Sequence, residues 1–219
     1  MRFHRVLFDL DGTLVDSLPL IIECSRLAGE EIGLPWNEER IRGMIGIPLL
    51  ETGERLLGKG KGVYYRDVYL KYFHLLHNEK IAVFAGIPEM LDDLRKEGIQ
   101  MAVVTSKIYD SAMLTLRETG LFCYFDQIIT ASEPCTPKPS PAPALLCLER
   151  MGRGKEGAVF VGDSPYDMQC GKGAELSTCG VCWGMAKREI LAAEHPDYLV
   201  DTVNELTALL LTGREIEKK

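Results

Sequence analysis

The fold of this chain is decided by the stretch Val6-Leu7-Phe8-Asp9-Leu10-Asp11-Gly12-Thr13, an apolar run that ends in two carboxylates one residue apart. A short apolar run closed by a Gly turn is typical of a buried strand. Alternate side chains of an extended chain point to the same face, so Asp9 and Asp11 can act on one substrate. The end of such a strand is where open α/β sheets bind their ligands. A solvated turn is the alternative, because Asp-Gly is a common turn dipeptide.

Three later apolar segments also lead into polar clusters. Residues 100–104 end in Thr105-Ser106-Lys107, residues 127–130 precede Thr136-Pro137-Lys138-Pro139, and residues 157–161 end in Gly162-Asp163-Ser164-Pro165-Tyr166-Asp167. The carboxyl ends of parallel strands meet at one edge of a sheet. We therefore expect the four clusters to form one site.

The spacing of apolar residues divides the chain into two parts. From about Ser17 to Ala82 these residues recur at i, i+3 and i+4, as in amphipathic helices. From Gly86 onward, helical patterns alternate with short apolar strands, which indicates parallel βαβ units. The sequence thus predicts an α/β protein with a Rossmann-like parallel sheet core, residues 1–16 and 83–219, and a small all-helical insertion, residues 17–82, after the first strand.

The ordered set of motifs DxDGT, VTSK, PKP and GDSxxD resembles that of the haloacid dehalogenase-like phosphatases, and within them the phosphoglycolate phosphatase group. The resemblance extends almost from end to end and identifies the helical insertion with the small cap of that family. It implies a phosphoryl-accepting nucleophile at Asp9 and a general acid/base at Asp11. It further implies a phosphate-binding pair, Thr105 and Lys138, and acidic residues that hold or position magnesium, Asp163 and Asp167.

Physical chemistry supports the same roles. Phosphoryl transfer depends on positioning and on neutralising negative charge, so several carboxylates that face a phosphate require a cation. Oxygen donors with no nearby His or Cys suit a hard ion, and Mg²⁺ fits best. The candidate ligands are Asp9, Asp11, Asp163 and Asp167. Attack by Asp9 on phosphorus would give an aspartyl-phosphate, and Asp11 would protonate the leaving oxygen and then deprotonate the attacking water.

Four residues are candidates for contacts with the substrate. Lys138 is counted as catalytic as well as substrate-binding, because its charge can reach a phosphate oxygen and the nucleophile together. Thr105 can donate a hydroxyl hydrogen bond, Ser106 lies beside it, and Arg42 of the predicted cap can reach an anionic leaving group. Each has an ordinary alternative role, as a solvated charge or as a turn or cap residue. Asp167 has one as well, because an acidic residue in the first turn of a helix favours the helix dipole.

Composition agrees with a compact enzyme. The chain has 219 residues, 46% hydrophobic and 26% charged, enough for the core of one α/β domain with an insertion. No apolar run approaches the roughly 20 residues that span a bilayer, and the sequence begins directly with a strand instead of a signal peptide. The seven cysteines show no paired spacing except Cys179-Gly-Val-Cys182, which we interpret as part of a buried strand. They predict reduced thiols, so we expect a cytoplasmic protein, monomer or homodimer. The net charge of −7 argues against nucleic acid or an anionic membrane as partner.

We therefore predict a Mg²⁺-dependent phosphatase, a phosphoric monoester hydrolase, that acts on a small phosphorylated metabolite. Phosphoglycolate is the first candidate by the resemblance. An inorganic pyrophosphatase and a sugar-phosphate mutase of the same fold are alternatives, although the fourth motif of the mutases usually begins Glu-Asp, where this chain has Gly162-Asp163. A non-catalytic binding or regulatory protein is a further alternative, and such a chain should have lost one of Asp9, Asp11, Lys138 or Asp163.

Overall fold

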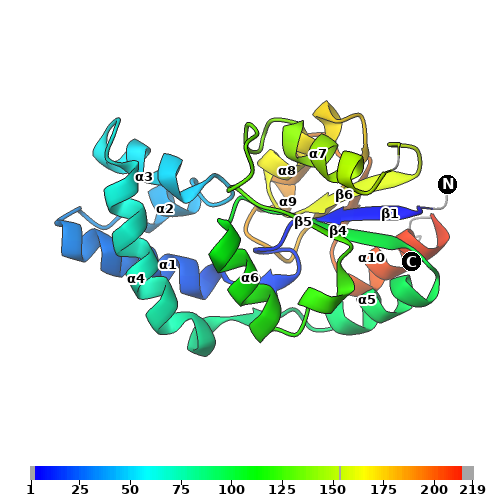
Figure 1. The fold of residues 1–219 in the computed structure, drawn as a ribbon, viewed down its shortest axis with the longest axis horizontal. Helices are drawn as coiled ribbons and strands as arrows, with labels where there is room; N and C mark the ends of the chain where they lie inside the picture. Colours follow the sequence, from blue (N-terminus) through cyan, green and yellow to red (C-terminus); the bar gives the residue numbers. More distant parts are fainter. Residues whose placement is uncertain (1–2, 153, 214–219) are drawn as a thin grey trace.

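A six-stranded sheet forms the centre of the computed structural model, which describes residues 3–152 and 154–213 (Figure 1). Its strands are β1 (Arg5–Phe8), β4 (Gln100–Val104), β5 (Gln127–Ile129), β6 (Ala158–Gly162), β7 (Ser177–Val181) and β8 (Tyr198–Val200). They lie in the order β5-β4-β1-β6-β7-β8, and every neighbouring pair is parallel. The prediction of an α/β fold with a parallel sheet is confirmed, and β1 lies in the middle of the sheet.

Helices cover both faces of this sheet because successive side chains of each strand point to opposite faces. On one face, Val6 and Phe8 of β1 share a core with residues of α5 (Ile87–Lys96), α6 (Tyr109–Glu118) and α10 (Val203–Thr212). On the other face, Leu7 shares a core with residues of α7 (Ala142–Arg150) and α8 (Pro165–Gly173). In Figure 1, α7 and α8 lie above the sheet and α5 and α10 below it. The 3-10 helix η1 (Phe122–Tyr124) and α9 (Arg188–Ala193) complete this part of the molecule.

The insertion at the left of Figure 1 is all-helical, as the sequence predicted. It consists of α1 (Leu18–Ile32), α2 (Glu38–Arg42), α3 (Leu49–Leu57) and α4 (Gly62–Lys80). It has an apolar core of its own, in which α1 meets α4 through Leu20, Cys24, Ala28, Tyr65, Val68, Tyr69 and Phe73. The exact boundaries at residues 17 and 82 stay a prediction. Among the described residues, no helix is both long and apolar enough to cross a membrane.

The chain enters and leaves the insertion through a two-stranded ribbon. Strand β2 (Val15–Asp16) pairs antiparallel with β3 (Ala82–Val83), so that Asp16 faces Ala82. The Phe84 N–H continues the ribbon by donating to the Leu14 carbonyl at 3.2 Å. The two crossings between sheet and insertion therefore lie side by side, a few residues beyond β1.

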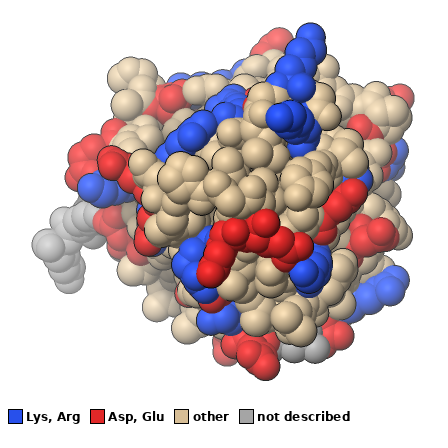
Figure 2. Space-filling view, turned by 90° about the vertical axis from the view of Figure 1, so that its left-hand side faces the viewer, with Lys and Arg blue, Asp and Glu red and all other residues tan. Residues whose placement is uncertain are grey.

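The outer end of the insertion carries both signs of charge. Figure 2 shows Lys and Arg side chains next to Asp and Glu side chains over this face. Elsewhere within the insertion, Arg26 forms ion pairs with Glu23 and Glu30, and Lys71 forms one with Glu31. The charge on this face is therefore mixed in sign, and the residues of the motifs lie on the other side of the insertion, at the sheet edge.

Candidate active site

The carboxyl end of β1 collects the polar clusters because β1 lies between β4 and β6. Phe8 pairs with Val103 on one side and with Val161 on the other, so the residues that follow the three strands emerge together. Asp9 is fixed at the backbone, since its N–H donates to the Val161 carbonyl at 2.9 Å. Thr105 follows β4 directly.

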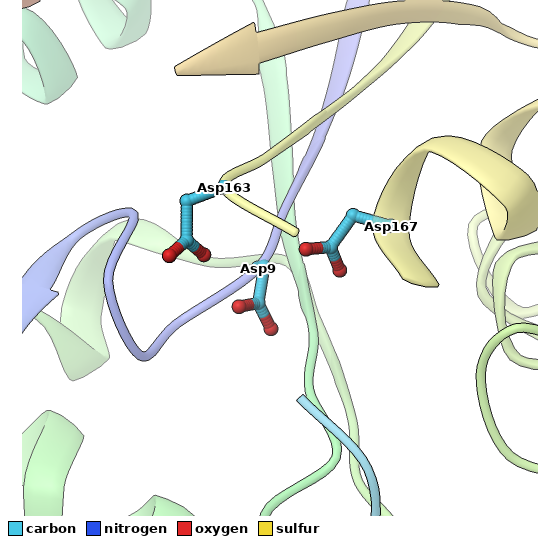
Figure 3. Close-up of side chains that lie close together, drawn as sticks. All are labelled: Asp9, Asp163 and Asp167. Atoms are coloured by element: carbon cyan, nitrogen blue, oxygen red, sulfur yellow. The ribbon is translucent and has the colours of Figure 1, made fainter. Parts of the chain in front are cut away.

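Three carboxylates converge at this edge. Asp9, Asp163 and Asp167 each offer one carboxylate oxygen, and these oxygens all lie within 4.8 Å of one another (Figure 3). Asp9 is 6% exposed and the other two are 0% exposed. Three acidic side chains are thus held together away from water, an arrangement that is unfavourable unless cations offset it.

Burial and repulsion between carboxylates both favour protonation of Asp9 and Asp163. Burial raises the pKa of Asp9 from 3.8 to about 7, and the Asp167 and Asp11 carboxylates add to this effect while Lys138 opposes it. Burial likewise raises the pKa of Asp163 well above its ordinary value, with further contributions from Asp9 and Asp167. Perturbed acids of this kind, facing a cavity, are typical of functional sites.

Lys138 supplies the protein's own counter-charge. Its Nζ lies 2.7 Å from Asp9 Oδ1 and 2.6 Å from Asp167 Oδ1, and the residue is 3% exposed. Burial alone would lower the pKa of Lys138, but the two carboxylates outweigh burial and raise this pKa above its usual range. Lys138 therefore stays an ammonium group that joins two of the three acids.

One ammonium against three carboxylates leaves an excess of negative charge when all three acids are ionised. The donor atoms of the cluster are all carboxylate oxygens, which are hard ligands suited to hard divalent ions. The cluster of Asp9, Asp163 and Asp167 therefore fits a divalent cation. Lys138 bonds only Oδ1 of Asp9, so Oδ2 is not engaged by this lysine.

Asp163 is held by groups that the motifs alone did not indicate. The Thr13 hydroxyl donates to Asp163 Oδ1 at 3.2 Å, and the Met185 N–H donates to Oδ2 at 2.7 Å. A Cβ at Gly12, whose φ is +83°, would lie 2.2 Å from Asp163 Oδ2, and a Cβ at Gly184 would lie 2.3 Å from the Asp163 Cβ. Both positions need glycine so that the backbone can close around this carboxylate.

Asp167 has two structural partners at once. Ser164 is the N-cap of α8, and the Ser164 and Asp167 side chains each bond the other's backbone N–H in a capping box. Asp167 Oδ2 accepts the Ser164 N–H at 3.0 Å, while Oδ1 accepts from Lys138. The Asp167 carboxylate therefore both caps the start of α8 and orients Lys138 toward Asp9.

Asp11 lies apart from these three acids. Its two carboxylate oxygens accept from Lys107 Nζ at 2.7 and 2.9 Å. The structure does not bring the Asp11 side chain into the group that could hold a metal, because the ion pair with Lys107 draws it toward the insertion. Asp11 does line the same cavity as Asp9. Lys107 belongs to the VTSK motif, but no role for it was predicted from the sequence.

The other candidate residues divide between cavity and surface. Thr105 is 5% exposed and lines the cavity beside Asp9. Ser106 lines it too, but its hydroxyl donates to the Gly46 carbonyl of the insertion at 2.6 Å. Arg42 pairs with Glu38 at 2.8 Å on an exposed helix face and is absent from the described cavity lining. A contact between Arg42 and substrate stays a prediction without support from this geometry.

A cavity of about 100 Å³ separates the sheet edge from the insertion. Asp9, Asp11 and Asp163 form its floor, and the insertion contributes mainly apolar walls, namely Ile21, Ile41, Met44, Ile45, Ile47, Leu49, Tyr69, Leu70 and Phe73. Lys107 is the cationic side chain among the described lining residues. Ser111 adds a buried hydroxyl that has no hydrogen-bond partner within the described chain. The space admits several water molecules or one small ligand.

Known proteins share both sequence and fold with this chain. Residues 6–181 match the model of the haloacid dehalogenase-like hydrolase family. The pyrophosphatase PpaX of Bacillus velezensis is 35% identical over 214 residues, covering 97% of each chain. The probable phosphatase IndB of Dickeya dadantii is 33% identical over 208 residues, covering 92% of this chain and 90% of its own. A haloacid dehalogenase-like family hydrolase from Streptococcus pneumoniae has a similar structure, with a TM-score of 0.84 at 25% identity, covering 94% of this chain and 97% of that one.

The chain therefore belongs to the haloacid dehalogenase-like hydrolase family. It shares the fold of that family and has a buried group of acidic side chains suited to a divalent metal.

Proposed function

We propose that the protein is a Mg²⁺-dependent phosphatase that works through an aspartyl-phosphate on Asp9, with inorganic pyrophosphate as its foremost substrate. The observation that carries the proposal is the buried cluster of three carboxylates, joined by Lys138, at the end of β1 and on the floor of the cavity. Mg²⁺ held by Asp9, Asp163 and Asp167 would supply the positive charge that lets a phosphate approach these acids.

Asp9 is the nucleophile in this proposal. Lys138 binds its Oδ1 and keeps the carboxylate oriented, so that the second oxygen can attack phosphorus along the line of the leaving group. Thr105, at the end of β4, has a hydroxyl hydrogen that can be donated to a phosphate oxygen, because its oxygen accepts the Lys107 N–H at 3.1 Å. The phosphoryl group would thus lie between Asp9, Lys138 and Thr105.

Asp11 serves as the general acid/base. It lines the cavity on the side toward Lys107 and the insertion, where the leaving group must lie if Asp9 attacks from the floor. Asp11 would protonate the departing oxygen and, in the second step, take a proton from the water that attacks the aspartyl-phosphate. The apolar walls would exclude other water during the first step.

Pyrophosphate is favoured over phosphoglycolate for two reasons. Several relatives named pyrophosphatase PpaX are 31–35% identical over nearly the whole chain. In addition, Arg42, which we expected to reach the carboxylate of phosphoglycolate, pairs with Glu38 outside the described cavity lining. Among the polar groups of the described cavity lining, the Lys107 ammonium and the unpartnered Ser111 hydroxyl suit a compact anion such as phosphate.

A direct test compares phosphate release from pyrophosphate, phosphoglycolate and p-nitrophenyl phosphate, each with Mg²⁺ and with EDTA. We expect the highest kcat/KM on pyrophosphate, dependence on Mg²⁺, and loss of turnover in Asp9→Asn. A higher kcat/KM on phosphoglycolate than on pyrophosphate would show that the monoester is the preferred substrate of the two. Full turnover in EDTA would overturn the metal requirement, and no release from any of the three substrates would overturn the proposed function.

A further inference from the structure

Lys107 is fixed at both its backbone and its side chain. Its N–H donates to Thr105 Oγ1 at 3.1 Å, and its carbonyl accepts the Ala131 N–H at 2.9 Å. Its ammonium bonds both oxygens of Asp11, at 2.7 and 2.9 Å. The two side chains are only 10% and 15% exposed. A largely buried pair of this kind is screened less than a surface ion pair, which water and salt weaken.

The same ammonium also contacts the insertion. Lys107 Nζ lies 5.1 Å from the ring centroid of Phe73, within the range of a cation–π interaction. Phe73 belongs to α4, is 1% exposed, and stacks on Tyr69 in the insertion core. Lys107 therefore joins the acid of the sheet edge to a rigid ring of the insertion.

Without Lys107, the position of Asp11 would be unfavourable. Asp11 lies close enough to Asp9 for the two carboxylates to repel each other. Lys138 is already engaged by Asp9 and Asp167. Lys107 is the cation that holds Asp11 on the leaving-group side of the cavity.

We propose that Lys107 is a positioning residue that orients Asp11 for proton transfer to and from the leaving group, with the orientation completed when the Phe73 ring lies over the ammonium. This inference rests on the proposed function, in which Asp11 is the acid/base. It predicts that loss of Lys107 affects reactions in proportion to their need for a proton. Protonation matters most for a basic alkoxide and least for an acidic phenol.

The experiment compares Lys107→Met and Lys107→Arg on an alkyl phosphate and on p-nitrophenyl phosphate. Since small misplacements of a catalytic group can cost up to about a hundredfold in rate, we expect Lys107→Met to lower kcat on the alkyl ester about tenfold or more. On the aryl ester the loss should be under about threefold, with little change in KM on either. Lys107→Arg, which keeps the charge, should recover most of the rate.

Lys71→Met is the matched control. Lys71 makes the same two interactions, an ion pair with Glu31 at 2.7 Å and a ring contact with Tyr72 at 5.0 Å, but it is 60% exposed and lies outside the described cavity lining. This variant should leave the rates on both esters unchanged. Equal losses by Lys107→Met on the two esters would overturn the positioning role.

A second measurement separates this proposal from the function on which it rests. In an Asp11→Asn background, Lys107→Met should cause no further loss of rate, and the shift in urea midpoint that it causes in the wild type should shrink. Undiminished effects in that background would show that Lys107 does not act through Asp11 and would overturn the inference. A wild-type protein inactive on every ester would refute the proposed function, and the urea measurements would still decide whether Asp11 and Lys107 are coupled.

Discussion

Replacing Lys138 with Met should destabilise the protein strongly while preserving the shape of the site. Met has a similar length and packs well in buried positions, so the change removes mainly the charge. Lys138 makes two charge-assisted bonds, at 2.7 Å to Asp9 and 2.6 Å to Asp167, and is 3% exposed. Removing one partner of a buried ion pair costs about 3–5 kcal/mol of unfolding free energy, because the other charges stay buried. A typical domain has only about 5–15 kcal/mol in total.

The loss of unfolding free energy in Lys138→Met should increase as the pH rises. Burial raises the pKa of Asp9 to about 7 even though Lys138 lowers it, so the variant should raise this pKa further. An acid whose pKa is higher in the folded state stabilises the fold below its unfolded pKa and loses that contribution as the pH rises through the folded pKa. The variant should therefore be nearest to the wild type at pH 5 and furthest from it above pH 8.

Urea unfolding in EDTA, followed by circular dichroism at pH 5 and pH 8.5, measures both the loss of unfolding free energy and its change with pH. Lys155→Met is the control, because Lys155 pairs with Glu175 on the surface, where the two side chains are 44% and 74% exposed. That change should cost less than about 1 kcal/mol at either pH. A deficit for Lys138→Met as small as the control's, or one that is equal at the two pH values, would refute the reasoning.

Three further predictions concern other parts of the molecule. Asp9→Asn should remove turnover and leave the circular dichroism unchanged, since the amide cannot be the nucleophile; turnover without conversion of Asn to Asp would contradict the mechanism. Ser106→Ala removes the bond to the Gly46 carbonyl across the boundary with the insertion and should lower unfolding free energy by about 0.5–1.5 kcal/mol and raise KM; an unchanged urea midpoint and KM would argue against this contact. Glu175 occupies a left-handed conformation, with φ at +58°. Glu175→Gly should therefore raise the unfolding free energy by about 0.5–1 kcal/mol and the thermal midpoint with it. A lower midpoint would show that the ion pair with Lys155 contributes more stability than the relief of backbone strain.

The sequence predicted the gathering of the site because topology alone determines it. Asp9, Thr105 and Asp163 each follow an apolar strand, and the carboxyl ends of adjacent parallel strands necessarily meet. The helical insertion was predictable from a change of periodicity alone. The prediction of phosphoglycolate as first substrate rested on resemblance, and the similarity to PpaX now favours the alternative.

Details that depend on side-chain direction were beyond the sequence. Arg42 has the positive charge that an anionic leaving group needs and lies in the insertion. Its side chain forms an ion pair with the exposed Glu38, one helical turn earlier. Ser106 and Lys107 are neighbours in the motif, yet their partners, Gly46 and Asp11, lie far away in the chain. The Ser106 bond depends on how the insertion packs on the sheet, and the Lys107 bond depends on the direction of two side chains at the sheet edge. The Met185 amide that binds Asp163 is a backbone group, which any residue except proline could supply.

The ribbon of β2 and β3 makes the insertion an exchangeable module. Asp16 and Ala82 are direct cross-strand partners, and the Cα atoms of such partners lie about 4.5–5.5 Å apart. A hairpin turn of a few residues spans the same gap. For the connectivity of the sheet, the whole insertion is therefore equivalent to one long loop between two adjacent points. The insertion could be lengthened, replaced or reduced to a turn without altering the register of any strand in the core. Evolution can thus change the walls of the cavity while its acidic floor stays the same.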